Sequence, residues 1–235
     1  MGKNLIQQRR GKGTHKFRAP SFRYKGRVEY SLLSDNVLSG EVIDIINCPG
    51  HTAPLAHIKY DNGEEIITIA PEGIRVGEKV SYGKGIIRPG NVMKLKDMPE
   101  GTAIFNIEAQ PGDGGKFVRS SGCFAKLVSK FHDKIVVLLP SKKEKEFKGN
   151  CRASIGIIAG SGRKEKPFYK AGNKYKAMKA KNKLYPRVSG VSMNSVDHPF
   201  GGSSSHSKGR PTQAARNAPP GRKVGKIAPK KTGKR

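Results

Sequence analysis

Short runs in which apolar and polar residues alternate, separated by turn residues, fill the segment from residue 34 to about residue 100. Residues 55–60 follow this period of two, which is typical of a strand with one buried face. Asn62-Gly63 then precedes a β-branched run at residues 66–69. Because Asn and Gly tolerate positive φ, this spacing predicts a hairpin. Five or so short antiparallel strands predict a small barrel. The further strands expected here are residues 42–46, 79–82, 85–88 and 92–95.

A second β-rich module is expected from residue 101 onward. Pro99-Glu100-Gly101 marks the boundary, because Pro and Gly interrupt regular structure. Residues 130–134 form a connection short enough for a hairpin. A short basic helix is expected at residues 171–181, where lysines crowd together. The strands expected in this module are residues 103–108, 116–119, 123–129, 135–139, 145–148 and 152–158.

The two ends of the chain lack such patterns. Beyond residue 160, apolar residues come singly between Lys, Arg, Gly and Pro. These segments bury too little apolar surface to offset the entropy of the chain, so we expect them to be extended or disordered alone and to order on a dense negative surface. The predicted organisation is a basic N-terminal extension at residues 1–33, β-modules at 34–100 and 101–181, and a C-terminal tail at 182–235.

Charge is concentrated at the same two ends. Residues 1–30 carry nine Lys or Arg against one acid, and residues 160–235 carry 20 against two, while the remaining 129 residues hold 17 basic and 15 acidic side chains. The ends supply +26 of the net charge of +28. A nucleic acid is the expected partner, because neutralising its phosphates releases counterions. The aromatic residues interleaved with this charge can stack on unpaired bases: Phe17, Phe22, Tyr24, Phe168, Tyr169, Tyr175 and Tyr185.

Other partners and compartments fit less well. A polybasic membrane tether would need lipidation or an amphipathic apolar face. The longest apolar run, residues 135–139, is far too short to span a bilayer, and the first seven residues lack the apolar stretch of a signal peptide. Three widely spaced cysteines form neither a metal-binding pattern nor a disulfide framework, which favours a reducing compartment.

Two glycine-rich loops match phosphate-binding motifs only in part. Residues 112–116 end in Gly-Gly-Lys, but Gln110 stands where a P-loop needs its first Gly, and Phe117 follows Lys116. We interpret this segment as a tight loop between strands, with close backbone approach to an RNA phosphate as the alternative. Residues 156–162 lack the G-x-G-x-x-G spacing, so a dinucleotide site is not expected.

Asp197-His198 suggests a catalytic alternative, an RNA-acting hydrolase. A nucleophilic triad, however, needs a poised Ser or Cys and a base that a third group orients, and adjacent Asp and His side chains usually diverge. Metal binding through His198 and His206 is disfavoured, because flexible Ser and Gly residues separate them. From spacing alone, His198 is expected to be a polar loop residue that touches a phosphate or a base.

Residues 190–202 read GVSMNSVDHPFGG, and this stretch closely resembles the C-terminal signature of the universal L2 family of large-subunit ribosomal proteins. Phe200 stands where the bacterial branch tends to carry a second His, which favours the archaeal and eukaryotic branch, and the small size favours an archaeal type. Further blocks resemble the same family in order along the whole chain: residues 8–13, 17–24, 111–116, 166–174 and 216–225.

The resemblance implies a mainly β fold, in which an OB-like barrel precedes an SH3-like barrel and extended basic arms penetrate rRNA. It implies a structural, non-enzymatic protein of the cytoplasmic ribosome that binds large-subunit rRNA and supports subunit association and the RNA around the peptidyl-transferase region. The partners are then this rRNA, neighbouring ribosomal proteins and the small subunit, with no membrane and no small-molecule substrate. No cofactor is expected, apart from Mg²⁺ shared with rRNA.

The residues expected to bind RNA are mostly basic or amide side chains of the arms, because Arg suits bidentate phosphate contacts and Lys supplies diffuse charge. His198 matches a prominent His of the family and is expected to support local RNA structure, with general-base chemistry as a minor alternative. A third hypothesis is a compactor that binds duplex DNA as tightly as rRNA. The residues chosen are Arg9, Arg10, Lys12, Arg18, Arg23, Lys116, Lys170, Asn173, Lys174, Asn194, His198, Arg216, Asn217, Arg222 and Lys223.

Overall fold

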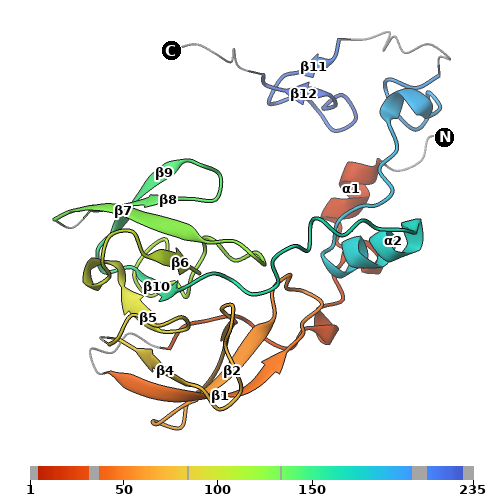
Figure 1. The fold of residues 1–235 in the computed structure, drawn as a ribbon. Helices are drawn as coiled ribbons and strands as arrows, with labels where there is room; N and C mark the ends of the chain where they lie inside the picture. Colours follow the sequence, from red (N-terminus) through yellow and green to blue (C-terminus); the bar gives the residue numbers. More distant parts are fainter. Residues whose placement is uncertain (1–4, 32–36, 84, 133, 203–210, 230–235) are drawn as a thin grey trace. The chain divides into compact units, whose positions relative to one another are not determined.

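The chain divides into two compact units. The computed structural model describes residues 5–31, 37–83, 85–132, 134–202 and 211–229 (Figure 1). Ser21–Tyr169 form the first unit, called here the β unit, and Met1–Pro20 combine with Lys170–Arg235 in the second, the basic unit. Within the described ranges, no helix has both the length and the apolar character needed to cross a membrane.

The first half of the β unit contains four strands: β1 (Leu38–Ile46), β2 (Leu55–Tyr60), β3 (Glu65–Ile69) and β4 (Lys79–Tyr82). β1 pairs with β2 and β4, and β2 pairs with β3, all antiparallel. The predicted β2–β3 hairpin is confirmed, and Gly63 in its turn adopts a φ of +82°. The alternation in β2 is also confirmed, because Ala56, Ile58 and Tyr60 are buried while Lys59 is exposed. These buried side chains belong to one core cluster.

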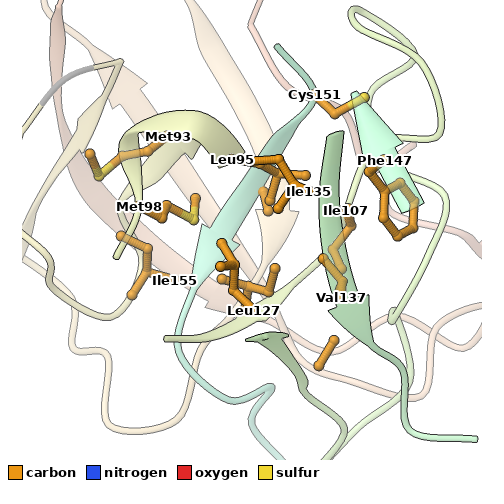
Figure 2. Close-up of a cluster of buried hydrophobic side chains, with 13 residues drawn as sticks. Met93, Leu95, Met98, Ile107, Leu127, Ile135, Val137, Phe147, Cys151 and Ile155 are labelled. Atoms are coloured by element: carbon orange, nitrogen blue, oxygen red, sulfur yellow. The ribbon is translucent and has the colours of Figure 1, made fainter. Parts of the chain in front are cut away.

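Six strands complete a ten-stranded sheet: β5 (Val92–Lys94), β6 (Ala103–Phe105), β7 (Ala125–Phe131), β8 (Lys134–Leu138), β9 (Glu144–Lys148) and β10 (Arg152–Ile155). The strand order is β3-β2-β1-β4-β5-β10-β6-β7-β8-β9, so β10 lies between β5 and β6. The predicted hairpin at residues 130–134 is confirmed, because β7 and β8 pair antiparallel. Side chains of these strands and of the 3-10 helix η3 (Leu95–Asp97) form a second core, which includes Leu127, Ile135 and Phe147 (Figure 2).

Two predicted strands are wrong. Residues 85–88 have no regular structure, and their two isoleucines are 70% and 49% exposed, so no buried face holds this segment on a sheet. Residues 116–119 contribute a single bridge, from Phe117 to Ile107. The strand does not continue because Val118 adopts a φ of +53°, which interrupts the extended backbone.

Positive φ also ends two strands earlier than the sequence pattern predicts. β6 ends at Phe105 because Asn106 adopts a φ of +48°, and β10 ends at Ile155 because Gly156 adopts a φ of +114°. The alternating pattern therefore locates these strands correctly, but it does not reveal the backbone conformation at which they stop.

A third core joins the two halves of the β unit. It combines Leu55 and Ile69 of the first half with Phe105 and Ile158 of the second. Val28, which belongs to the predicted N-terminal extension, is buried in the same cluster at 3% exposure. The predicted mainly β class is confirmed, and the two halves of the sheet are consistent with an OB-like module followed by an SH3-like module.

The basic unit contains little regular structure. α2 confirms the predicted basic helix, whereas α1 was not predicted, although its Gln and Arg residues are good helix formers. Among the described residues of this unit, only Phe200 and Ala214 are buried. Its elements are α1 (Ile6–Gly11), η1 (His15–Phe17), α2 (Ala171–Ala180), η4 (Gly190–Ser192) and the parallel pair β11 (Gln213–Ala214) and β12 (Lys226–Ile227).

Candidate nucleic-acid interface

Lys and Arg dominate the basic unit. Its 86 residues include 23 Lys or Arg and one acid, Asp197, whereas the 149 residues of the β unit include 23 basic and 17 acidic side chains. One carboxylate cannot neutralise 23 cations, and most of the cations in the described part of the unit are exposed. A compact basic unit therefore requires external negative charge to offset its self-repulsion.

α1 carries two of the predicted RNA-binding side chains, and a third follows it. Arg9 and Arg10 lie in its last turn, Lys12 follows directly, and all three are exposed. The Arg9 guanidinium carbon lies 5.9 Å from the centroid of the Phe17 ring, and Arg18, just after η1, is also exposed. The N-terminal arm thus presents its cations to solvent beside an aromatic ring.

α2 carries a second group of predicted residues. Lys170 is its N-cap, and Asn173 and Lys174 are exposed near its start. The Lys174 ammonium lies 5.2 Å from the centroid of the Tyr185 ring, which is a cation–π distance. None of the helix residues is buried. Residues 171–176 are exposed and 177–180 half-buried, so the first part of α2 offers its charge to a partner.

A cleft of about 320 Å³ lies within the basic unit, lined by residues of α1, η1, α2 and the segment after α2. The Lys179 ammonium connects its walls, because it donates to the backbone oxygens of Lys16 at 2.9 Å and of Arg18 at 3.5 Å. The aromatic residues interleaved with basic ones in the sequence predicted side chains that stack on bases. No feature of the sequence predicted that several of them come together in one cleft. The lining includes aromatic Phe17, Tyr175 and Tyr185 and basic Arg10, Lys16, Lys179 and Lys183.

The signature loop, residues 190–202, is held by backbone hydrogen bonds and close packing. The Asn194 carbonyl accepts from the His198 N–H at 3.2 Å, while the Asn194 side chain is exposed. A Cβ at Gly201 would lie 2.3 Å from a backbone oxygen, and a Cβ at Gly190 would lie 2.3 Å from the His198 ring. The path of the loop therefore requires glycine at position 201, and a side chain at position 190 would displace the His198 ring.

The His198 ring is fixed from within its own loop. Its centroid lies 5.1 Å from that of Phe200, and the Phe200 N–H donates to His198 Nδ1 at 3.0 Å. Because Nδ1 accepts, the proton of the neutral imidazole lies on Nε2. In a catalytic dyad, Nδ1–H would instead donate to the carboxylate. This geometry argues against a hydrolase in which Asp197 orients His198.

The C-terminal segment returns to the N-terminal helix. Arg216, Asn217 and Arg222 are exposed, and Lys223 is half-buried. Gln7 Nε2, on α1, donates to the Lys223 carbonyl at 3.1 Å. The basic unit therefore brings predicted residues from the two ends of the sequence together.

Two predicted residues lie in the β unit. Arg23 is exposed, and its guanidinium carbon lies 5.4 Å from the centroid of the Phe22 ring, which is 81% exposed. Lys116 is exposed at the end of the loop at residues 112–116. Each is accessible to a partner.

The N–H groups in and before that loop are directed to protein carboxylates. Asp113 Oδ1 and Oδ2 accept from three of them and Glu108 Oε1 from the fourth, at 3.0–3.3 Å. These donors are therefore not presented to a phosphate, which supports the interpretation of a tight structural loop. The donors are Ala109, Gln110 and Gly115 to Asp113, and Gly114 to Glu108.

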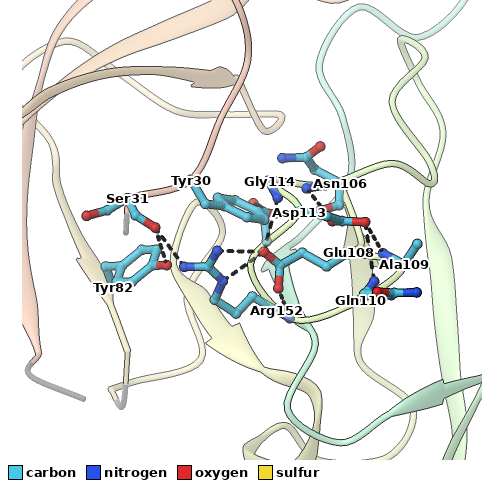
Figure 3. A network of polar contacts seen from close by, with 12 residues as sticks. Tyr30, Ser31, Tyr82, Asn106, Glu108, Ala109, Gln110, Asp113, Gly114 and Arg152 are labelled. Atoms are coloured by element: carbon cyan, nitrogen blue, oxygen red, sulfur yellow. Dashed lines mark hydrogen bonds and ion pairs between the residues drawn. The ribbon is translucent and has the colours of Figure 1, made fainter. Parts of the chain in front are cut away.

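A buried ion pair connects this loop to both halves of the β unit (Figure 3). Arg152 Nη2 lies 2.6 Å from Glu108 Oε1, and the two side chains are 5% and 0% exposed. Arg152 Nη1 also donates to the Ser31 carbonyl at 2.8 Å, as does the Tyr82 hydroxyl at 3.1 Å. Burial raises the pKa of Glu108, and the hydrogen bonds from the backbone N–H groups of Arg152 and Gly114 partly offset this rise. Burial lowers the pKa of Arg152. We call Arg152, Glu108, Ser31 and Tyr82 the polar clamp.

No group of three or more His, Cys, Asp or Glu is placed to hold a metal ion in the part of the chain that the structure describes. His206, considered above as a partner of His198, lies outside the described residues. Within those residues, the arrangement is that of a binding surface built from cations, aromatic rings and closely approaching backbone.

Comparison with known proteins gives two family matches. The model of the family described as Ribosomal Proteins L2, RNA binding N-terminal domain, matches residues 2–82, and that of Ribosomal Proteins L2, C-terminal domain, matches residues 88–220. The chain is 52% identical over 240 residues to the large ribosomal subunit protein uL2 of Methanothermobacter thermautotrophicus, and equally to that of Methanosphaera stadtmanae. It is 51% identical over 236 residues to that of Archaeoglobus fulgidus. Each alignment covers 100% of both chains.

Proposed function

Because the chain belongs to the ribosomal protein L2 family, in its archaeal type, we propose that it is a structural component of the large ribosomal subunit that binds large-subunit rRNA. The relatives carry the name of a ribosomal protein and not that of an enzyme, in agreement with the predicted structural role. The observation that carries the proposal is the basic unit, with 23 cations against one acid.

The two units have different tasks in this proposal. The β unit is a rigid body that the polar clamp and three hydrophobic cores hold together. The basic unit follows crowded phosphates, where Arg makes bidentate contacts and Lys adds diffuse charge. Glycines without room for a side chain, as at Gly190 and Gly201, let the signature loop pack closely on itself.

His198 supports the RNA structure through a hydrogen bond. Its Nδ1 is occupied by the Phe200 N–H, so Nε2–H is the group that donates to a phosphate, a ribose or a base edge. A histidine held in this way positions RNA without taking a proton from it. The reaction at the peptidyl-transferase region is then left to the RNA.

The test is equilibrium binding of the full chain to large-subunit rRNA over a salt series, with duplex DNA as a competitor at matched salt. We expect a steep salt dependence, because many phosphates are neutralised, and a clear preference for rRNA. Equal affinity for duplex DNA would favour the compactor hypothesis instead. Co-sedimentation of the native protein with large subunits through a high-salt wash is the complementary measurement.

Support of subunit association and of the RNA around the peptidyl-transferase region is a finer part of the proposal. It is supported by the resemblance of residues 190–202 to the family signature and by the exposed side chains of that loop. Neighbouring ribosomal proteins, the small subunit and Mg²⁺ shared with rRNA are the further partners proposed. Large subunits reconstituted without the protein should associate more weakly with small subunits in a sucrose gradient.

A further inference from the structure

The cleft in the basic unit combines the two chemical features that a nucleotide requires. Three aromatic rings, Phe17, Tyr175 and Tyr185, can stack on a base, and the lysines beside them can neutralise its phosphate. No carboxylate is among the residues that line it. We propose that this cleft holds one unpaired nucleotide of the large-subunit rRNA, an inference that rests on the proposed function.

The walls of the cleft are joined by contacts within the basic unit itself. Lys179 on α2 donates to the backbone of Lys16 at 2.9 Å, which fixes η1 against the helix. Tyr185 and Phe17 each lie beside a cation, Lys174 at 5.2 Å and Arg9 at 5.9 Å from the ring centroids. These contacts hold the rings in place and reduce the entropy lost when a base stacks on them.

The size of the cleft selects a single base. At about 320 Å³, it lies at the lower end of the ~300–1,000 Å³ range of small-molecule pockets. A duplex cannot enter it, whereas a base extruded from a loop or bulge can, and such bases are the usual targets of specific RNA recognition. Asn182, also in the lining and with a φ of +52°, provides an amide that can both donate to and accept from a base edge.

The experiment compares full-length variants that remove rings but not charges. Tyr175→Leu combined with Tyr185→Leu should weaken binding to transcribed large-subunit rRNA by about 5- to 150-fold, which corresponds to the ~1–3 kcal/mol of stacking on one base. The slope of affinity against salt should not change, because no phosphate contact is lost. Chemical probing should show one base that gains reactivity while the rest of the footprint persists.

Two matched variants control for folding and for general loss of aromatic surface. Tyr175→Phe combined with Tyr185→Phe keeps both rings and should bind within about twofold of the original chain. Phe131→Leu removes a ring of the β unit that is 63% exposed, and it should also bind normally. Weakening by Phe131→Leu as large as that of the double Leu variant would overturn the proposal, because the effect would not belong to the cleft.

The remaining outcomes separate this inference from the proposed function. If the double Leu variant binds rRNA as tightly as the original chain and leaves every base unchanged, the cleft holds no nucleotide and rRNA binding still stands. If the original chain itself does not bind large-subunit rRNA, both proposals fail.

Discussion

The β unit and the basic unit use their residues in opposite ways. The β unit has 149 residues with 23 basic and 17 acidic side chains and builds three hydrophobic cores, whereas the basic unit has 86 residues with 23 basic side chains and one acid. In the described part of the basic unit, only Phe200 and Ala214 are buried. Burial of apolar side chains stabilises the β unit, whereas the basic unit carries an excess of positive charge that a polyanion neutralises.

Removal of residues 182–235 should give the largest difference between an effect on RNA binding and an effect on folding. The deletion removes 12 Lys or Arg, so affinity for rRNA should fall by orders of magnitude and the salt slope by several units. None of the three cores contains a residue from the described part of this segment, so the thermal midpoint should move by less than about 2 °C. Calorimetry and filter binding measure the two effects. Loss of the cooperative transition would show that the tail supports the β unit after all.

Glu108→Ala should have the largest effect on the stability of the β unit. It leaves the Arg152 charge buried without its carboxylate, at a cost of about 3–5 kcal/mol in the free energy of unfolding, which urea denaturation measures. Glu146→Ala is the matched control, because Glu146 pairs with Lys134 at 3.4 Å on the surface and should cost less than about 1 kcal/mol. Equal costs for the two variants would mean that the polar clamp contributes no more than a surface pair.

Ile135→Val should give a smaller loss confined to the second core. Ile135 is 0% exposed, so removing one methylene group should lower the free energy of unfolding by about 0.5–1.5 kcal/mol. The affinity for rRNA, measured well below the melting temperature, should not change. An altered salt slope would contradict the separation of folding from RNA binding.

Arg216→Gln should have the smallest effect, and only on binding. Arg216 is exposed in the basic unit, so the variant should bind rRNA modestly more weakly with a salt slope reduced by about one unit, and its melting temperature should not move. Lys148→Gln, on an exposed position of β9, is the control in the β unit. An unchanged slope for Arg216→Gln would mean that this side chain contacts no phosphate.

Much of the β unit could be predicted from the sequence because its strands are half-buried. Apolar and polar residues alternate along residues 55–60, and their exposure to solvent follows this pattern. The Asn62-Gly63 turn forms the predicted hairpin. The errors arise where backbone conformation overrides the pattern, as at Val118 with its positive φ, or where an apolar run has no face to bury, as at residues 85–88.

The candidate interface was predictable as chemistry but not as geometry. Interleaved charge and aromatic residues indicate RNA binding without any knowledge of the fold. The pairing of Arg152 with Glu108, 44 residues apart, and the convergence of Phe17 and Tyr185 in one cleft depend on the tertiary path of the chain. Local spacing carries no signal for contacts of that kind.

The hydrogen bond from Lys179 to the Lys16 carbonyl has a consequence for biosynthesis. Its two ends are 163 residues apart, so the first segment of the chain emerges from the translating ribosome long before the side chain that secures it exists. The Lys16 carbonyl therefore gains this hydrogen bond only after about three-quarters of the protein has been made. Closure of the basic unit across its two ends is thereby one of the later steps in forming the protein.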